Sequence, residues 1–192
     1  MKKLESDKLN LGSGQYKKKG FINLDFVGDT NPDVVWDLDK FPYPFPDSKF
    51  EIVTAYHLIE HVKDPFKTMV EIHRIMKDGG KLIIRTPHFS RGFTHPDHKR
   101  GYDVSFPLYF DKRYKAFYYG VSFGLKSMKL SWFAQPYMKK QVLSPFMYYS
   151  GTILGGIINF FANLSPYFCS RIWCYWVGGF EEIEYVFIKK ND

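Results

Sequence analysis

The sequence predicts an α/β domain built on a mostly parallel sheet. Short apolar runs end in glycine or aspartate, as strands do where they approach a ligand. A capped helical segment separates two of these runs, which indicates a crossover between parallel strands. The 192 residues, of which 45% are hydrophobic and 24% charged, can form one buried core. We therefore expect a single domain over residues 1–192.

The first half of the chain carries five expected strands and one helix. The helix begins at Pro65, where Asp64 can cap it, and the glycines of Asp78-Gly79-Gly80 can end it. Its apolar residues recur at helical spacing. The expected strands cover residues 8–11, 21–26, 33–36, 50–56 and 81–86.

The second half has a different pattern. Residues 111–119 look helical, and residues 123–133 and 180–189 look like strands. Between these two strands, residues 141–170 contain no charged side chain. Such a run is long enough to cross a membrane, but its glycines, asparagines and proline weaken that interpretation. A single crossing would also separate two strands that should pair, so one or two apolar helices are expected instead.

The charge balance favours anionic partners. The formal net charge is +7, from 27 Lys and Arg against 20 Asp and Glu. Phosphate-bearing substrates, acidic glycans or an anionic membrane surface would suit it. No stripe of basic and aromatic residues suggests a nucleic-acid module, so no nucleic acid is expected. Cys169 and Cys174 are too few for a disulfide framework, and residues 1–8 are polar, so we expect a cytoplasmic protein.

A glycine turn and two carboxylates follow the first three expected strands. At Gly12 and Gly14 the backbone can turn sharply, and no Cβ keeps a ligand away. Asp25 can accept both hydroxyls of a ribose, and Asp37 can accept from an adenine amino group while the backbone beside it, at Leu38, donates to a ring nitrogen. Either Asp alone is equally well explained as a cap or a solvated loop residue. Three such features in order favour an adenosine site.

These residues belong to a longer run that resembles the class I methyltransferases of the small, methyltransferase-type-11-like group. The resemblance covers residues 8–90. The matching segments are Leu9-Asn10-Leu11-Gly12-Ser13-Gly14, Asn23-Leu24-Asp25, Trp36-Asp37-Leu38, Phe45-Pro46-Asp47-Ser48-Lys49-Phe50-Glu51-Ile52-Val53, His57-Leu58-Ile59-Glu60-His61-Val62, Asp64-Pro65 and Leu82-Ile83-Ile84-Arg85-Thr86-Pro87.

The resemblance implies a Rossmann-like sheet of seven strands whose last strand is antiparallel, with the apolar insert 141–170 before it. It implies S-adenosylmethionine as cofactor in residues 8–90, and an acceptor-side half in residues 91–192. No metal is expected. The residues implied to contact the cofactor are Asn10, Gly12, Ser13 and Gly14 at the methionine end, Asp25 at the ribose, Asp37 and Leu38 at the adenine, and His57 beside the sulfonium.

The chain departs from the family pattern at two places. Asn10 stands where the family usually has an acidic residue that contacts the methionine amino group. Only ten residues separate Gly14 from Asp25, too few for the usual first helix and a strand. This shortening resembles a truncated subgroup associated with polysaccharide and glycan biosynthesis. In addition, Lys17 stands where a dinucleotide site would have its third glycine, which disfavours a pyrophosphate ligand.

A metal site is the competing interpretation of one segment. His57-Leu58-Ile59-Glu60-His61 has the His-x-x-Glu-His spacing of the inverted zinc proteases, in which two histidines on a helix bind zinc. The segment follows a strand directly and Pro65 comes soon after, so little helix is available. We expect instead that Glu60 and His61 hold the loop by hydrogen bonds.

The connection after the fifth strand is the expected acceptor side. Residues 88–100 are rich in histidine, and histidine takes up protons near neutral pH. His98 is the first candidate for a general base and His95 the second, with Asp97 able to orient an imidazole. A loop held by hydrogen bonds explains these residues equally well. Methyl transfer can also proceed by positioning alone.

The expected reaction is methyl transfer from S-adenosylmethionine to a small-molecule or glycan acceptor. A hydroxyl of a sugar or of a lipid-linked glycan precursor is the expected acceptor group. The alternative is a non-catalytic cofactor-binding or partner-dependent subunit. Residues 141–170 would cover the acceptor pocket, form a homodimer contact or lie at a membrane interface, so the chain is expected to be cytoplasmic with a peripheral membrane contact as one option.

Overall fold

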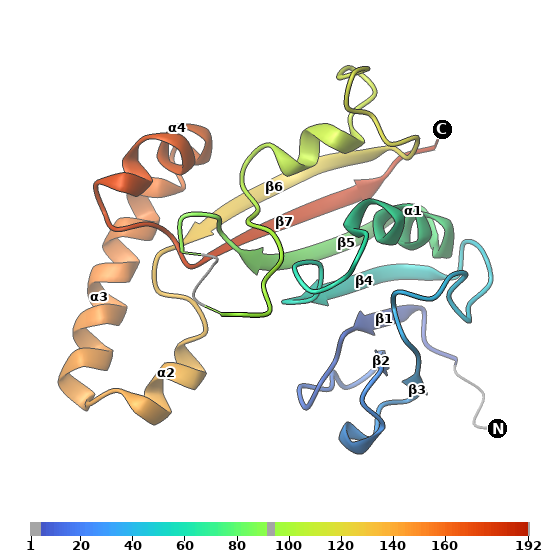
Figure 1. Cartoon of the computed structure of the whole chain (residues 1–192), viewed down its shortest axis with the longest axis horizontal. Helices are drawn as coiled ribbons and strands as arrows, with labels where there is room; N and C mark the ends of the chain where they lie inside the picture. The colour runs from blue at the N-terminus through green and yellow to red at the C-terminus, as the bar shows by residue number, and fades with distance from the viewer. Residues whose placement is uncertain (1–4, 92–94, 192) are drawn as a thin grey trace. The chain divides into compact units, whose positions relative to one another are not determined.

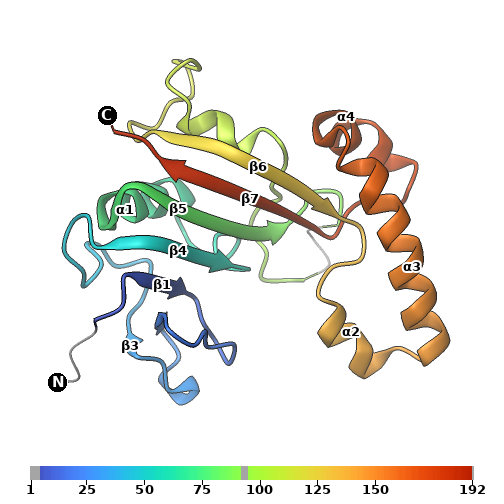
Figure 2. The same ribbon diagram turned by 180° about the vertical axis from the view of Figure 1, so that it is seen from behind.

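The computed structural model describes residues 5–91 and 95–191 as an α/β protein whose seven strands form one sheet (Figure 1). The sheet order is β3-β2-β1-β4-β5-β7-β6, and β7 runs antiparallel to its neighbours, as the view from behind also shows (Figure 2). The predicted fold class is therefore confirmed. The strands are β1 (Lys8–Leu11), β2 (Ile22–Asp25), β3 (Val34–Val35), β4 (Phe50–Tyr56), β5 (Met76–Pro87), β6 (Phe123–Ser131) and β7 (Glu182–Lys189).

The parallel strands place their carboxyl ends level with one another. Leu11 pairs with Leu24 of β2 and with Ala55 of β4, and Tyr56 pairs with Arg85 of β5. The residues that follow these pairs, Gly12 and Asp25 among them, therefore emerge at one edge of the sheet. Leu9, Leu11 and Leu24 lie on one face of the sheet and are fully buried.

Helix α1 (Pro65–Ile75) begins where the sequence predicts. Asp64 caps it, because one carboxylate oxygen accepts from the backbone N–H groups of Phe66 and Lys67 at 3.0 and 2.9 Å. Its end was wrongly predicted at Asp78-Gly79-Gly80. Met76 already has an extended backbone and pairs with β4.

Gly79 and Gly80 instead form part of a β-bulge in strand β5. Phe50 pairs with Met76 but Ile52 pairs with Lys81, so the residues between Met76 and Lys81 have no matching length of β4. Gly79 has φ +74°, and a Cβ on Gly80 would lie 2.7 Å from the carbonyl oxygen of Lys77. Glycine is needed at both positions for this bulge.

The expected helix over residues 111–119 is not present. A 3-10 helix, η3 (Phe106–Phe110), precedes this segment, and separate turns follow it. The Asp111 side chain accepts from the backbone N–H of Arg113 at 3.0 Å, a local bond that competes with helix formation. The Tyr119 ring stacks on Phe66 of α1, with centroids 3.9 Å apart, so packing against α1 favours the turns.

The described chain divides into two compact units. Of the described residues, the first unit comprises 5–85, 107–127 and 185–191, and the second comprises 86–91, 95–106 and 128–184. The predicted single domain stays a prediction. The second unit contains α2 (Pro136–Val142), α3 (Pro145–Ala162), α4 (Pro166–Arg171) and the 3-10 helix η4 (Trp173–Tyr175), where one or two apolar helices were predicted. Another short 3-10 helix, η1 (Gly28–Thr30), follows β2.

Proline stands first in each of α2, α3 and α4, where its missing N–H has no helical partner to lose. Among the described residues, no helix combines the length and apolar character needed to cross a membrane.

Candidate functional site

The glycine turn leaves β1 in a left-handed backbone conformation. Gly12 and Gly14 have φ values of +63° and +46°. The backbone N–H of Ser13 donates to Leu24 at 3.1 Å, which fastens the turn to β2. A Cβ on Gly12 would lie 2.9 Å from Leu58, whereas a Cβ on Gly14 would meet no described atom within 4 Å. The turn is therefore packed at Gly12 and open at Gly14.

The structure brings Asp25 and the glycine turn together, as predicted. Asp25 is only 6% exposed, and its two oxygens accept from the backbone N–H groups of Gly14 at 2.7 Å and Val27 at 2.9 Å. Each oxygen keeps a second acceptor direction, so a ligand hydroxyl can still be bound. The carboxylate holds the turn in place, and its contact with a ribose stays a prediction.

Asp37 lies beyond the short strand β3. The backbone N–H of Trp36 donates to the carbonyl of Asp25 at 2.9 Å, which sets the next residue at the same edge of the sheet. The Asp37 side chain is exposed, and one oxygen accepts from the N–H of Asp39 at 3.0 Å. Leu38 is buried, and its carbonyl accepts from the Tyr43 hydroxyl at 3.1 Å. The Asp37 carboxylate is thus available to a ligand.

Asn10 lies in a buried row of polar side chains across three strands. The register sets Asn10 beside Asn23 of β2 and Thr54 of β4. The Asn10 amide nitrogen donates to Asn23 at 3.1 Å and to the carbonyl of Tyr16 at 3.3 Å, and its oxygen accepts from Thr54 at 2.9 Å. Both ends of the carboxamide are therefore engaged within the protein. We refer to Asn23, Asn10 and Thr54 as the polar row.

Lys18 covers the polar row in place of the missing first helix. Its ammonium donates to Thr54 at 2.7 Å and lies 3.5 Å from the centre of the Tyr56 ring. The Arg85 guanidinium lies 4.5 Å from the same ring. Burial, and then the charge of Arg85, lower the pKa of Lys18 to about 8. Two cationic side chains therefore lie against the Tyr56 ring.

Lys18 was missed as a site residue in the sequence. The available signals were the lysine cluster at residues 17–19 and the short connection between the first two strands. Without the strand register, nothing distinguishes Lys18 from the lysines on either side of it.

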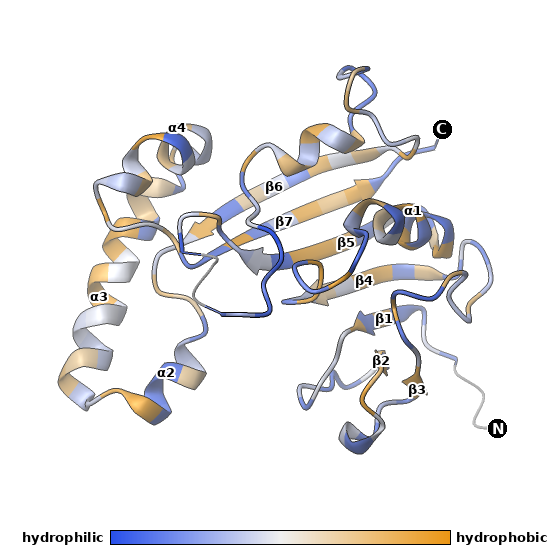
Figure 3. Cartoon of the chain, in the orientation of Figure 1, coloured by the Kyte–Doolittle hydropathy of each residue, from blue (hydrophilic) through white to orange (hydrophobic). Residues whose placement is uncertain are grey.

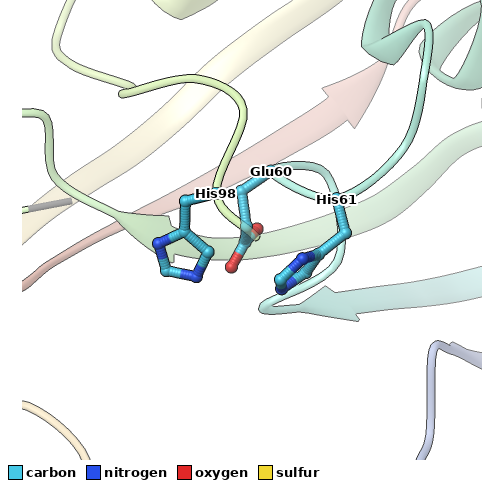
Figure 4. Close-up of side chains that lie close together, drawn as sticks. All are labelled: Glu60, His61 and His98. Atoms are coloured by element: carbon cyan, nitrogen blue, oxygen red, sulfur yellow. The ribbon is translucent and has the colours of Figure 1, made fainter. Parts of the chain in front are cut away.

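The His-x-x-Glu-His segment is a turn rather than a helix. Residues 57–61 leave β4 with a left-handed backbone at His57, φ +50°. The Nδ1 atom of His57 lies 3.4 Å from a carboxylate oxygen of the fully buried Glu60. Glu60 and His61 extend to the same side of the turn (Figure 4). The helix on which an inverted zinc protease carries its two histidines is absent from this described segment, which removes the basis for that interpretation.

Comparison with known proteins finds similarity to methyltransferases. Residues 16–84 match the family described as Methyltransferase domain. A curated relative, the ubiquinone/menaquinone biosynthesis C-methyltransferase UbiE of Pseudoalteromonas translucida, is 26% identical over 97 residues, which are 50% of this chain and 33% of the relative. The chain spans one third or less of the length of the curated relatives that it matches.

Solved structures match over nearly the whole chain. An S-adenosylmethionine-dependent methyltransferase from Mesorhizobium loti superposes with a TM-score of 0.56 at 13% identity, covering 97% of this chain and 93% of that one. The chain has the fold of the class I methyltransferases. The [4+2]-cyclase SpnF superposes with a TM-score of 0.58 at 14% identity, covering 96% of this chain and 74% of that one. The glycine turn and Asp25 lie at the carboxyl ends of β1 and β2, and ligands of open α/β sheets generally bind outside such strand ends.

The three residues that the sequence predicts to be catalytic, His95, Asp97 and His98, lie in the second unit. His95 and His98 stack with ring centroids 5.0 Å apart, and the backbone N–H of Asp97 donates to Nδ1 of His95 at 3.3 Å. The structure therefore brings the three candidates together in one turn. Residues 92–94 of the same connection lie outside the described residues. The role of any of the three as a base stays a prediction.

His88 is a buried histidine that sequence reasoning did not select. Its two ring nitrogens lie 2.7 Å from the hydroxyl of Ser90 and 2.8 Å from that of Ser170. Burial lowers the pKa of His88 to about 4, against a smaller opposing effect of Asp103. His88 is therefore a neutral link between the end of β5 and α4. The sequence pattern of residues 88–100 does not distinguish His88, which is buried, from the other histidines of this segment.

Proposed function

We propose that the chain is a methyltransferase that transfers a methyl group from S-adenosylmethionine to an acceptor hydroxyl. The observation that carries the proposal is the glycine turn fastened to Asp25 at the carboxyl ends of β1 and β2. Asp25 lies within the segment that matches a methyltransferase domain, and the glycine turn lies just before it. The acceptor that we propose is a hydroxyl of a sugar or of a lipid-linked glycan precursor, because the shortened connection after Gly14 resembles the subgroup associated with glycan biosynthesis.

The residues of the glycine turn and Asp37 suit S-adenosylmethionine as a ligand. Ser13 is buried in the turn, and its hydroxyl has no hydrogen-bond partner within the described part of the chain. A ligand group at the turn would give this hydroxyl a partner. The open space beside Gly14 and the exposed carboxylate of Asp37 suit the two ends of an extended ligand. When bound, S-adenosylmethionine supplies an electrophilic methyl group on a sulfonium and leaves as S-adenosylhomocysteine.

Each residue then has a defined task. Asp25 accepts from ribose hydroxyls while it keeps the turn closed, and Asp37 accepts from the adenine amino group. Lys18 and Arg85 attract the carboxylate of the ligand's methionine end. His98, with His95 as the second choice, accepts the proton of the acceptor hydroxyl.

A cofactor-binding subunit without its own turnover is the second candidate. Asn10 favours it, because the carboxamide is engaged at both ends within the protein where the family usually has an acidic residue. The superposition on a [4+2]-cyclase also shows that this fold does not fix one reaction.

Calorimetry with S-adenosylmethionine and S-adenosylhomocysteine tests the binding half of the proposal. Asp37→Ala should weaken binding by about 5- to 150-fold, equivalent to the roughly 1–3 kcal/mol of a lost hydrogen bond. Asp29→Ala removes another exposed carboxylate after β2 and is the matched control. Wild-type protein that binds neither ligand would overturn the proposal. Binding with no labelled methyl transfer to nucleotide sugars or lipid-linked sugars would favour the cofactor-binding subunit.

A further inference from the structure

Helix α3 turns its largest apolar side chains outward. Phe146, Ile153, Ile157 and Phe160, with Leu164 just past the helix end, follow one another at spacings of three, four or seven residues and so share one face. Their exposed fractions are 82%, 66%, 54%, 65% and 70% in that order. We refer to these five residues as the α3 ridge. Figure 3 shows mostly orange and pale colour along α3, whereas part of α2 is blue.

The opposite face of α3 fixes the helix to its own unit with small and polar residues. The Asn163 side chain accepts from the N–H of Leu130 at 2.8 Å and donates to its carbonyl at 2.9 Å. Asn159 accepts from the N–H of Trp132 at 2.7 Å. A Cβ on Gly155 would lie 2.8 Å from Phe133, so the backbone approaches closely there. These contacts determine that the α3 ridge faces away from the packed side.

The sequence on either side of α3 carries only basic charges over residues 112–180. Residues 112–180 contain no Asp or Glu, and all the charged side chains among them are basic. They hold eight of the 27 Lys and Arg, which leaves 19 basic against 20 acidic residues in the rest of the chain. In the second unit, Lys129 and Lys140 are exposed, while Lys139 pairs with Glu181 and Arg171 pairs with Asp103. The eight residues are Lys112, Arg113, Lys115, Lys126, Lys129, Lys139, Lys140 and Arg171.

Tyrosine and tryptophan side chains are exposed both within α3 and in the segment that follows it. Tyr149, Tyr167, Tyr175 and Trp176 are 59%, 51%, 68% and 73% exposed. Tyrosine and tryptophan rings prefer the level of lipid headgroups, where one end is apolar and the other is hydrated. An apolar ridge, exposed tyrosine and tryptophan rings and exposed basic residues such as Lys129 and Lys140 are features of a helix that lies in a membrane interface.

We propose that α3 docks this protein on an anionic lipid membrane, with the α3 ridge immersed among the acyl chains and Lys129 and Lys140 at the headgroups. A second copy of the chain is the less suitable occupant. In a two-fold contact the same surface meets itself, so the basic residues would face one another. The docking surface does not depend on the proposed reaction.

Vesicle flotation with the full chain tests the docking. The protein should float with vesicles of phosphatidylcholine and phosphatidylglycerol, and much less with phosphatidylcholine alone. Phe146→Asp with Phe160→Asp should weaken partition at least about tenfold for each substitution, since each removes the burial of an aromatic ring. Lys129→Glu with Lys140→Glu should weaken partition to the anionic vesicles by about fivefold or more for each substitution, with no such effect on phosphatidylcholine alone. Val35→Asp changes an exposed apolar residue of the first unit and should float like wild type.

Three results would overturn the docking proposal. One is equal recovery of wild type with and without anionic vesicles. Another is a concentration-dependent dimer in light scattering that Phe146→Asp and Phe160→Asp abolish, with no flotation, which would assign the α3 ridge to a second copy. The last is flotation that survives both pairs of substitutions. A circular dichroism melt identical to that of wild type confirms that a variant is folded. If the variant with both phenylalanine substitutions does not fold, the variant with both lysine substitutions still tests the docking proposal.

Discussion

Replacement of Asp25 should destabilise the protein even when no cofactor is present. The carboxylate is 6% exposed and accepts two backbone hydrogen bonds, from Gly14 at 2.7 Å and from Val27 at 2.9 Å. A hydrogen bond to a charged group contributes about 1.5–3 kcal/mol. Val27 is partly exposed, so water can replace one of the two bonds. We therefore expect Asp25→Ala to lower the free energy of unfolding by about 2–4 kcal/mol.

Thermal unfolding without ligand measures this effect. For a chain of this length each kcal/mol lowers Tm by about 2–4 °C, so Asp25→Ala should melt about 5–15 °C below wild type. Asp25→Asn keeps one acceptor and should lose roughly half as much. Asp37→Ala, which removes an exposed carboxylate, should melt within about 2 °C of wild type. If cofactor-free Asp25→Ala melted together with wild type, Asp25 would not be what fastens the glycine turn.

Three more expectations concern separate parts of the molecule. Asp64→Ala should cost about 1 kcal/mol through loss of the α1 cap, and urea unfolding should show no such loss for Asp64→Asn, which can still cap. His88 binds protons less readily when folded than when unfolded, so stability should fall by up to about 3 kcal/mol as the pH drops from 6.5 to about 4. In His88→Asn the fall of Tm between pH 6.5 and about 4 that His88 causes should disappear. If Tm fell with pH as steeply as in wild type, His88 would not be its cause. Lys18 loses its charge above pH 8, so the affinity for S-adenosylmethionine should fall as the pH rises from 7.5 to 9.5. The α-amino group of the ligand titrates in the same range, so calorimetry should show a shallower pH profile for Lys18→Met than for wild type, and the same slope in both would exclude Lys18 from ligand binding.

Short-range signals allowed much of the fold to be predicted. The strands β1 and β4 have the predicted bounds, and α1 starts at the predicted proline. These elements are specified by contiguous apolar runs and by one capping residue. The glycine turn and Asp25 meet as predicted because parallel strands that are in register end together.

The remaining features depend on contacts between distant segments. The end of α1 could not be read from Gly79, because the bulge that uses this glycine depends on pairing with β4. Lys18 is positioned by Thr54 and Tyr56, which are more than thirty residues away in the sequence. The outward side of α3 is decided by Gly155 and Asn163, whereas the usual expectation would have buried Phe146 and Phe160.

The polar row ties three strands together, so a substitution at one member removes hydrogen bonds from its neighbours. An apolar residue in place of Asn10 would take one hydrogen bond from Asn23 and one from Thr54, and the remaining bonds of both to Lys18 would then hold the row. The short connection between β1 and β2 thereby supplies, through Lys18, one partner that both outer members of the row share.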